Sequence, residues 1–353
     1  MHMADALISP AAGGVMWALS AASAVYAAAK IKDEPGAGEK KAPLMAVAGA
    51  FVFAAQMINF TIPGTGSSGH IGGGILLAAL LGSFPGLLTI AAVLAIQCLF
   101  FADGGLLALG CNIFNMGVIP ALIIYPLIFK PLVRKGFTAP RITAASMLAV
   151  VIGLQLGAFA VVLETLASGI TALPFSVFVL LMQPIHLAIG IGEGIVTALV
   201  LAFVYKANPG ILEHSAARTI VPLRGKELSG GAAAGRTAPW GSVKKSLVLL
   251  GALALLTGGI LSIFASAYPD GLEWAIERTA GSAELEAEGP VFRRAEAIQE
   301  RTAFMPDYTF PGVSADSAGT ALAGIAGAVM SFLLAGGAGF VIYLVKRRRA
   351  KAV

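Results

Sequence analysis

Met1 and His2 place three nitrogen atoms within one short chelate at the start of the chain. The donors are the α-amine of Met1, the backbone nitrogen of His2 and the imidazole of His2. When the backbone nitrogen gives up its proton and binds a metal, the donors are forced nearly coplanar, and planar nitrogen coordination favours Ni(II) or Cu(II). The pattern therefore predicts a tightly held divalent metal ion with one equatorial position still open.

His70 is suited to close that open position. It lies in the glycine-rich segment 64–74, whose backbone can adopt conformations that other residues avoid. We expect the His70 imidazole to be the fourth nitrogen ligand. Residues that could orient the ligands, or couple the site to the rest of the protein, are Asp5, Ser68, Gln97, Asp103, Asn112, Asn115 and His186.

Two other interpretations of the N-terminus compete with a metal site. His2 and Met3 can be the remnant of a cloning junction, and the small residues at 22–24 resemble a signal-peptide cleavage site. A signal peptide needs a basic residue before its apolar region, but no Lys or Arg precedes Leu7, and Asp5 stands there instead. The residues up to this point leave the metal site and its alternatives open.

The composition indicates an integral membrane protein. Hydrophobic residues make up 57% of the 353 residues and charged residues only 12%, whereas soluble domains carry about 25% charged residues. The net charge of +5 comes from basic residues between apolar segments rather than along one polar face, which argues against nucleic-acid binding. Cys98 and Cys111 have no zinc-ligand spacing and are expected to be inert thiols.

Nine apolar segments are long enough, or nearly so, to cross a bilayer as helices. We expect an all-α integral membrane protein with a polytopic bundle of about seven transmembrane helices and a C-terminal two-helix transmembrane hairpin. The seventh segment is long and could be broken at Pro184. The segments are 10–29, 43–60, 71–82, 86–101, 112–129, 141–167, 173–205, 246–267 and 319–345.

Basic clusters follow the first, fifth, seventh and last of these segments. Cytoplasmic loops are enriched in Lys and Arg, so the clusters predict a multi-pass protein of the cytoplasmic membrane with its N-terminus outside. The same topology puts His70 and the segment 101–112 on the outer side with Met1 and His2. The clusters are Lys30, Lys32, Lys40 and Lys41; Lys130, Arg134, Lys135 and Arg141; Lys206, Arg218, Arg224, Lys226, Arg236, Lys244 and Lys245; and Lys346, Arg347, Arg348, Arg349 and Lys351.

Three ionisable residues, Glu164, His186 and Glu193, lie inside predicted membrane segments. Such side chains normally face the interior of a helix bundle and are functional candidates. His186 and Glu193 are two helical turns apart and would share one helix face. A hydrogen-bonded structural histidine is the alternative interpretation of His186.

A polar segment, 207–245, divides the chain into two domains. Residues 1–206 are predicted to form the metal-binding membrane domain, and 246–345 a companion domain of two transmembrane helices with an extracytoplasmic loop at 268–318. The segment between them is too poor in large apolar residues to form a core and would be a cytoplasmic linker. The outer loop is acidic, which can attract cations or simply provide a solvated surface.

The sequence contains none of the common catalytic motifs that we searched for. It has no G-x-x-x-x-G-K-[ST] phosphate loop, no H-E-x-x-H zinc motif and no G-x-S-x-G nucleophile motif. We therefore expect that the chain does not hydrolyse ATP through a phosphate loop, and an enzymatic function has little support in the sequence. A membrane metalloenzyme would need a general base beside the metal, and Asp103 is the one obvious candidate.

Several motifs together resemble the metal-binding membrane component of energy-coupling-factor cobalt/nickel transporters, the CbiM/NikM family. This match covers residues 1–206. A shorter motif, Pro269-Asp270-Gly271-Leu272-Glu273, resembles the small companion component of the same systems and covers 246–345. The motifs of the first match are the segments 1–10, 63–73, 101–105, 110–112 and 183–186.

The resemblance implies uptake of Ni²⁺ or Co²⁺ as the transported substrate, with no organic cofactor. It implies capture by the Met1 amine, the His2 amide and imidazole, and the His70 imidazole. Its partners would be a transmembrane coupling protein (the T component) and cytoplasmic ATP-binding-cassette ATPase subunits, besides membrane lipid. A stand-alone secondary divalent-metal permease is the alternative, although the ionisable residues inside the membrane are few for such a path. The residues do not distinguish nickel from cobalt.

Overall fold

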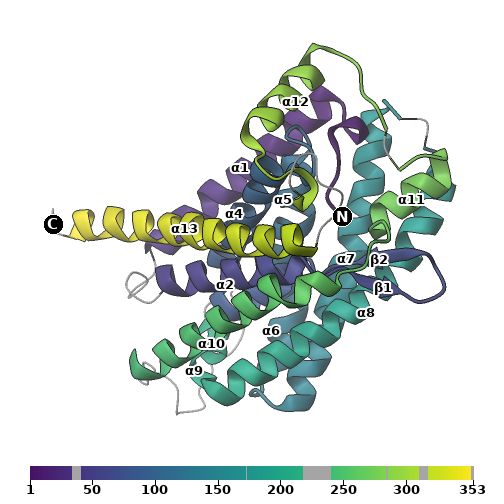
Figure 1. Ribbon diagram of the computed structural model, residues 1–353. Helices are drawn as coiled ribbons and strands as arrows, with labels where there is room; N and C mark the ends of the chain where they lie inside the picture. The colour runs from purple at the N-terminus through teal and green to yellow at the C-terminus, as the bar shows by residue number, and fades with distance from the viewer. Residues whose placement is uncertain (34–40, 172, 218–239, 284, 310–316, 351–353) are drawn as a thin grey trace.

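The computed structural model describes residues 1–33, 41–171, 173–217, 240–283, 285–309 and 317–350. Long helices dominate, joined by short turns and one small sheet (Figure 1). Most of the predicted linker, 218–239, lies outside the described residues. In chain order the elements are η1 (Asp5–Leu7), α1 (Pro10–Asp33), α2 (Lys41–Gln56), β1 (Phe60–Ile62), β2 (Ser67–Gly69), α3 (Gly74–Leu81), α4 (Ser83–Phe101), α5 (Leu109–Ile113), η2 (Phe114–Phe129), α6 (Lys130–Val133), α7 (Ala139–Ser168), α8 (Phe175–Ala207), α9 (Pro209–Ala217), α10 (Trp240–Gly259), η3 (Leu261–Phe264), α11 (Gly271–Ala280), α12 (Pro290–Thr302), η4 (Pro306–Tyr308) and α13 (Ser317–Ala350).

Six helical segments in the described part of the chain are long and apolar enough to cross a membrane. Two further apolar helices, Lys41–Gln56 and Ser246–Gly259, are shorter. These helices confirm the predicted all-α, polytopic membrane fold. The six segments are Pro10–Ile31, Ser83–Phe101, Leu109–Val133, Ala139–Ser168, Phe175–Ala207 and Gly319–Arg348.

Each of the nine predicted apolar segments contains a helix of the structure. The third segment forms only the short α3, which is buried along its whole length. The seventh is not broken, because α8 continues through Pro184 as one helix. The stretch η2 is wound as a π-helix and contains Pro120 and Pro126, whose missing N–H groups disfavour regular α-helical hydrogen bonding.

Small residues allow α7 and α8 to pack closely along each other. At Gly194 of α8, an added Cβ would lie only 3.2 Å from the Cα of Met147 in α7. At Gly190 it would lie 3.3 Å from the Cα of Val151. Close backbone approach at small residues is a common way to join helices in a membrane. Helices α7 and α8 together form one side of the site described below.

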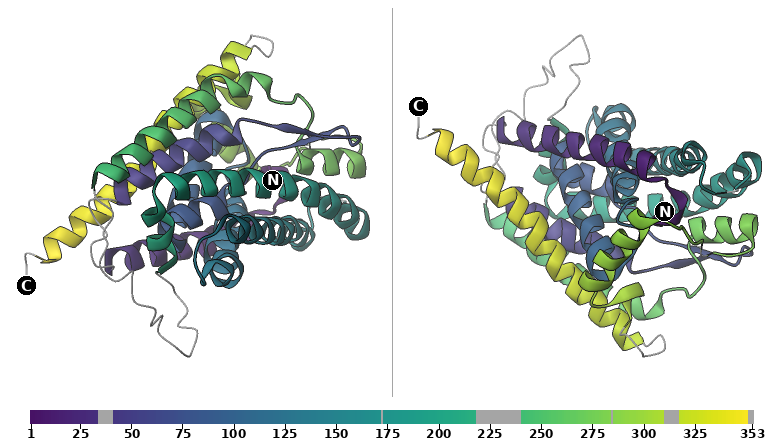
Figure 2. Two further views of the ribbon diagram at one scale, coloured as in Figure 1. Left: turned by 90° about the horizontal axis from the view of Figure 1, so that it is seen from below. Right: turned by 90° about the horizontal axis from the view of Figure 1, so that it is seen from above.

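The companion helices α10 and α13 pack on α2 of the first domain. Figure 2 shows these three helices running together along one face of the bundle. At Gly336 of α13, an added Cβ would lie 2.8 Å from the Cβ of Ala46, and at Gly339 it would lie 2.9 Å from the Cα of Ala42. Close helix contacts, and not only the linker, therefore join the two predicted domains.

An antiparallel hairpin follows α2 and carries His70 just beyond its second strand. The sequence predicts a flexible glycine-rich segment here and no strand. Gly73, with a φ of +78°, then turns the chain into α3, and this left-handed conformation favours glycine. His70 is therefore held between two defined elements. The register of the hairpin is Phe60↔Gly69, Thr61↔Ser68 and Ile62↔Ser67.

The described residues of the predicted outer loop, 268–318, contain two helices, α11 and α12. α11 begins with a capping box, in which the Asp270 side chain accepts a hydrogen bond from the N–H of Glu273 at 2.9 Å. The Glu273 side chain accepts one from the N–H of Asp270 at 3.0 Å. Because α11 packs against α8 and β2, the capping box lies on the first domain.

Candidate metal site

The first residues of the chain are buried in the bundle. Only 7% of Met1 is exposed, and Met3 is fully buried. The N–H of Met3 donates to Oδ1 of Asn112 at 2.8 Å, and Oδ1 of Asp5 accepts a hydrogen bond from the N–H of Ala108 at 2.9 Å. Two of the predicted supporting residues, Asn112 and Asp5, therefore hold the N-terminal segment in place.

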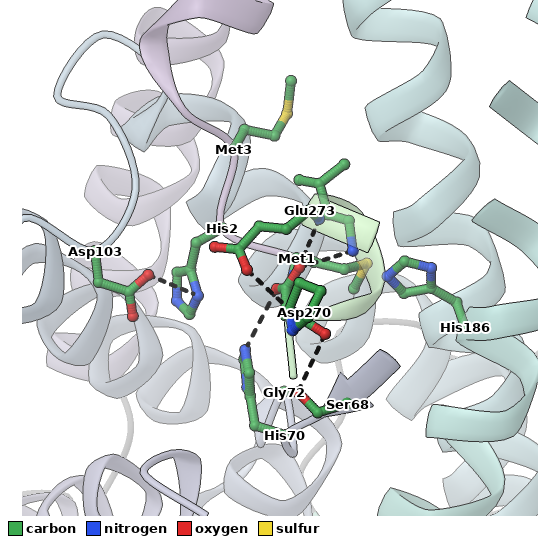
Figure 3. Close-up of polar contacts among 12 residues, drawn as sticks. Met1, His2, Met3, Ser68, His70, Gly72, Asp103, His186, Asp270 and Glu273 are labelled. Carbon is green, nitrogen blue, oxygen red and sulfur yellow. Dashed lines mark hydrogen bonds and ion pairs between the residues drawn. The ribbon is translucent and has the colours of Figure 1, made fainter. Parts of the chain in front are cut away.

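The His2 ring lies between the side chains of Gln97 and Asp103, and Figure 3 shows the contact with Asp103. Its Nε2 donates to Oε1 of Gln97 at 3.1 Å, so the lone pair of the neutral ring lies on Nδ1, the nitrogen nearer the backbone. Nδ1 is 3.3 Å from Oδ1 of Asp103. Burial lowers the pKa of His2, and the Asp103 charge opposes that shift only in part. Burial therefore favours the neutral ring that a metal requires.

Asp103 is fixed in turn by a residue of the companion domain. The Tyr308 hydroxyl donates a short hydrogen bond to Oδ2 of Asp103, and the Tyr308 ring stacks on Phe101 with ring centroids 5.0 Å apart. Burial, and then the Asp103 charge, raise the pKa of Tyr308 well above its usual value. Tyr308 therefore remains a hydrogen-bond donor to Asp103 at neutral pH.

His70 reaches the N-terminal segment from the end of β2. Its ring stacks on the His2 ring, with centroids 5.2 Å apart and 24° between the planes. Its Nδ1 donates to the carbonyl of Ile71 at 3.0 Å, which leaves the lone pair on Nε2. Burial, and then the charge of the Met1 ammonium, lower the pKa of His70 to about 4. At neutral pH the His70 ring is therefore uncharged, and its Nε2 can bind a metal.

Asp270 of the companion domain lies between the Met1 amine and His70 (Figure 3). Its Oδ2 is 2.9 Å from the amine nitrogen and 4.0 Å from Nε2 of His70. Burial alone would raise the pKa of Asp270, but the Met1 ammonium and His70 outweigh it and hold the pKa below its usual range. The Asp270 charge, and then burial, raise the pKa of Glu273 to about 7. Asp270 is therefore the ionised member of the capping box.

In the sequence, Asp270 falls in a predicted acidic outer loop, and nothing there connects it with the metal ligands. Asp270 is 269 positions from Met1, so no local spacing indicates their contact. The available signal was the pair Asp270 and Glu273, since an acidic residue followed three positions later by Glu is typical of a helix start. That signal predicts where α11 begins and not what its cap contacts.

Glu193 of α8 anchors the backbone that follows His70. Its two carboxylate oxygens accept hydrogen bonds from the N–H groups of Gly72 and Gly73, both at 2.9 Å. Only 3% of Glu193 is exposed. This carboxylate therefore positions the backbone of the His70 segment. Its shared helix face with His186 is not needed to explain why it is buried.

A second chain of hydrogen bonds connects the two histidine segments. Nε2 of Gln97 donates to Oε1 of Gln56 at 3.0 Å, and Nε2 of Gln56 donates to the carbonyl of Gly72 at 3.0 Å. Because Oε1 of Gln97 also accepts from His2, the chain runs from the His2 ring to the backbone beside His70. Of the predicted supporting residues, Gln97 and Asp103 therefore contact the predicted ligand His2 directly.

Ser68 joins the hairpin to the companion domain through hydrogen bonds to Tyr268 and Pro269. Its hydroxyl donates to the carbonyl of Tyr268 at 2.7 Å, and its N–H donates to the carbonyl of Pro269 at 2.8 Å. The indole N–H of Trp274 donates to the carbonyl of Thr65 at 3.0 Å in the same contact. These bonds hold Asp270 against the end of the hairpin.

Asn115 and His186, the remaining candidates, line cavities next to Met1. Asn115 donates to Glu164 at 2.8 Å and lines a cavity that Met1 and Glu193 also line. His186 lines a neighbouring cavity together with Met1, His70 and Asp270. The hydrogen bonds of these two residues go to Met3, Glu164 and Met182, which are not predicted ligands.

The structure brings Met1, His2 and His70 together, but side chains alone do not complete a metal site. Within the described ranges, no group of three or more His, Cys, Asp or Glu side chains is arranged to hold a metal ion. The imidazoles of His2 and His70 supply only two donors to a metal ion. The main-chain nitrogens of Met1 and His2 lie close enough to supply the others. A metal held here would therefore depend on the main-chain nitrogens that the sequence predicts as ligands.

Comparison with known proteins finds two family matches along the chain. Residues 2–211 match the family described as "Cobalt uptake substrate-specific transmembrane region". Residues 244–344 match the family described as "PDGLE domain". The second match contains Asp270 and both companion helices that pack on α2.

Similar proteins carry names of metal transporters. A "Putative fused nickel transport protein NikMN" of Archaeoglobus fulgidus is 31% identical over 335 residues, which cover 95% of this chain and 96% of that protein. A "Probable fused nickel transport protein LarMN" of Lactiplantibacillus plantarum is 31% identical over 62% of this chain and 68% of its own length. A solved structure described as a truncated transition metal transporter is 29% identical, with a TM-score of 0.51, and covers 58% of this chain and 99% of its own.

Proposed function

Because the chain belongs to the family of cobalt uptake substrate-specific transmembrane proteins, we propose that it captures Ni²⁺ or Co²⁺ outside the cell for uptake across the cytoplasmic membrane. Membership of this family also makes it a metal transport protein and not an enzyme. The ion is the transported substrate, so the ligands must both hold it and release it.

The observation that supports capture most directly is one oxygen atom that two predicted ligands share. Oδ2 of Asp270 lies 2.9 Å from the Met1 amine and 4.0 Å from Nε2 of His70, so both nitrogens face one point. The His2 ring is stacked on His70 beside that point. An ion beside this oxygen would be bound by the Met1 amine, the His2 amide and Nδ1, and Nε2 of His70.

The proposed ligands explain which ions would be selected. Four nitrogen donors suit Ni²⁺ and Co²⁺, whereas Mg²⁺ and Ca²⁺ prefer oxygen donors. Cu²⁺ would bind the same donors, so its exclusion depends on the supply of copper or on the geometry of the closed site. The stacked rings of His2 and His70, whose side chains are 7% and 10% exposed, would limit the access of water to the ion.

We further propose that uptake is driven by partners of an energy-coupling-factor transporter, a transmembrane coupling protein and cytoplasmic ATP-binding-cassette ATPases. The absence of a phosphate-binding loop from the sequence supports this division of labour. The proposed orientation has the N-terminus outside. It is supported by Lys30, Lys206 and Lys346, which lie at the C-terminal ends of α1, α8 and α13, and by the distance between Met1 and the end of α13 in Figure 1.

The proposed domain organisation assigns capture to 1–206 and closure of the site to 246–345, with 207–245 as a cytoplasmic linker. The two family matches, residues 2–211 and 244–344, extend into both ends of that segment and leave its middle unmatched. Asp270 and Tyr308, both in the companion domain, contact the Met1 amine and Asp103. The companion domain is therefore part of the capture site and not only a membrane anchor.

Isothermal titration calorimetry with Ni²⁺ and Co²⁺ tests the capture site. The protein should begin at Met1 and be compared with a variant that carries the extension Gly-Gly-Ser-Gly before Met1, with His70→Ala and with His214→Ala. The extension is longer than one residue because a single added residue would place a new amine within chelating distance of His2. We expect the extension and His70→Ala each to weaken binding by at least about tenfold, because each removes a nitrogen ligand. His214→Ala is the control, since His214 lies in α9 and lines neither cavity.

An unchanged affinity after the N-terminal extension would show that the amine is not a ligand, and the proposed capture site would be wrong. Uptake of ⁶³Ni²⁺ by cells with and without the coupling protein and ATPases tests the proposed energy source. Uptake that needs neither partner would instead identify the chain as a stand-alone secondary permease.

A further inference from the structure

A third histidine, His186, faces the cavity that Met1 and His70 line. It lies in α8, two turns before Glu193, and only 1% of the residue is exposed. Figure 3 shows its ring pointing toward the side chain of Met1, across the cavity from His70. None of the ligands proposed above includes this ring.

The hydrogen bonding of His186 leaves one ring nitrogen ready to bind. Its Nδ1 donates to the carbonyl of Met182 at 2.8 Å, so the lone pair of the neutral ring lies on Nε2. Nε2 is buried and has no hydrogen-bond partner. A buried polar atom without a partner costs about 1–3 kcal/mol and therefore needs an explanation.

His186 and His70 share this arrangement. In both rings Nδ1 donates to a main-chain carbonyl, and Nε2 carries the lone pair. Metal-ligating histidines typically donate their other ring N–H to a carbonyl or carboxylate, which fixes the tautomer and the ring orientation. The Met182 contact satisfies only the donor nitrogen, so a purely structural role leaves the buried Nε2 facing the cavity unexplained.

The walls of the cavity suit a transition metal ion better than Mg²⁺ or Ca²⁺. Besides the imidazoles, it is lined by Met1 and Met116, whose thioethers are soft donors. Gly271 of α11 closes it next to His186, where an added Cβ would lie 3.3 Å from Cε1 of the ring. The companion domain therefore leaves room for His186 and excludes larger side chains.

The cavity is adjacent to another one deeper in the first domain. Met1, Gly72 and Met116 line both, and the second is also lined by Asn115 and Glu193. His186 thus lies where an ion that leaves the capture site toward the bundle interior would pass. This position differs from the capture site, which is formed by the amine and the rings of His2 and His70.

We propose that Nε2 of His186 is the ligand of a second, inner position for the transported Ni²⁺ or Co²⁺, next to the capture site. This inference rests on the proposed function, because it assumes that a transition metal enters the cavity. His186 would receive the ion as the His2 and His70 ligands release it. The thioethers of Met1 and Met116 provide further weak donors there.

The first test measures Co²⁺ binding where the capture site has been removed. The background is the full chain, beginning at Met1, with His2→Ala and His70→Ala. We expect it to retain weak Co²⁺ binding in calorimetry, and we expect His186→Phe in that background to weaken it by at least about tenfold. The ligand-field absorption of bound Co²⁺ should change with the same substitution. Phenylalanine keeps a planar ring of similar size but supplies no nitrogen.

The second test places His186→Phe alone in the otherwise unchanged chain. Affinity at the capture site should stay within roughly threefold, while uptake with the partner proteins falls by at least about tenfold. Gln155→Leu is the matched control. It removes a hydrogen bond between α7 and α8, from Gln155 to the carbonyl of Gln183, and lines neither cavity. It should change neither Co²⁺ binding nor uptake by more than roughly threefold.

Three results would overturn the inner position. They are the absence of Co²⁺ binding in the His2→Ala, His70→Ala background, equal binding there with and without His186, and a loss of capture-site affinity in His186→Phe as large as in His70→Ala. His186→Ala replaces the phenylalanine variant if thermal unfolding shows that the latter does not fold. Failure of the capture proposal appears separately, as insensitivity to the N-terminal extension.

Discussion

The nitrogen that each histidine ring leaves free is decided by a single hydrogen bond. His2 uses Nε2 to donate to Gln97, and this leaves Nδ1 for a chelate with its own backbone nitrogen. His70 uses Nδ1 to donate to a carbonyl and leaves Nε2, the nitrogen that can reach a distant ion. The two rings therefore offer different nitrogens. His2 would bind the proposed ion together with its own backbone nitrogen, whereas His70 would reach the ion from a distant part of the chain.

The pH at which His70 gains a proton follows from its burial. We expect its ring to titrate near pH 4 in the metal-free protein, because burial lowers its pKa from 6.5 to about 4. The unfolded chain then binds more protons than the folded one between these two values. Acidification from pH 6.5 toward pH 4 should therefore lower the free energy of unfolding.

NMR of the protein with ¹³C-labelled histidine measures this titration. His70→Asn identifies the His70 signal and should weaken the acid destabilisation, because the group that titrates has been removed. A midpoint at pH 6.5 or above would contradict the expectation and would mean that the ring is exposed to solvent in the metal-free protein.

The closeness of Met1, His2 and His70 could be predicted from the sequence, because Met1 and His2 are neighbours in the chain and the predicted topology puts His70 on the same side of the membrane. The glycine-rich surroundings of His70 indicated mobility of the backbone and not the hairpin that the structure shows. Asp270 could not be assigned to the site, because its contacts come from the packing of α11 on α8 and β2. That the predicted ligands bind a metal stays a prediction.

At the scale of elements, hydropathy predicted the long helices and failed where elements are short or amphipathic. The nine apolar segments each contain a helix because the bilayer requires long apolar stretches with internal hydrogen bonding. The strands β1 and β2 have three residues each, too few to show alternation. α11 and α12 lie in a segment read as an acidic loop, although the capping residues of α11 were visible in it.

Asp270 serves two elements, since it caps α11 with Oδ1 and pairs with the Met1 amine through Oδ2. Asp270→Ala should speed hydrogen exchange at the amides of Leu272 and Glu273 about fivefold, because loss of an N-cap costs about 1 kcal/mol. Asp270→Asn should leave these amides within roughly twofold of wild type, because asparagine is an equally good cap.

Hydrogen-exchange mass spectrometry measures the effect. In both variants the N-terminal segment, residues 2–8, should exchange faster than in wild type, because each variant removes the ion pair with Met1. Equal protection of that segment in wild type and Asp270→Asn would show that the ion pair does not hold it.

At the scale of the whole molecule, the two domains cover one another. α2 is buried along most of its length because α10 and α13 pack on it from the companion domain. The capture site is closed by α11 and by Tyr308, which belong to the same domain. The first domain therefore lacks part of its own core, and part of its site, when it is alone.

A chain that ends at residue 217 should bind metal through its own ligands but should lose protection of the N-terminal segment. We expect exchange at residues 2–8 and along α2 to increase by at least about tenfold, since the contacts with α10, α11 and α13 are gone. Co-expression of 240–353 as a separate chain should restore protection, because the contacts between the domains are non-covalent. Exchange rates that do not respond to the companion domain would contradict the described packing.

The pairing of the Met1 amine with Asp270 also determines how an ion can enter without changing the charge of the buried site. Before capture, one ammonium is balanced by one carboxylate. In the capture that we propose, the two positive charges of the ion would be balanced by Asp270 and by the deprotonated backbone nitrogen of His2, while the amine would be neutral. Each incoming ion would then replace two protons in an electroneutral exchange, and no uncompensated charge would be buried in the protein.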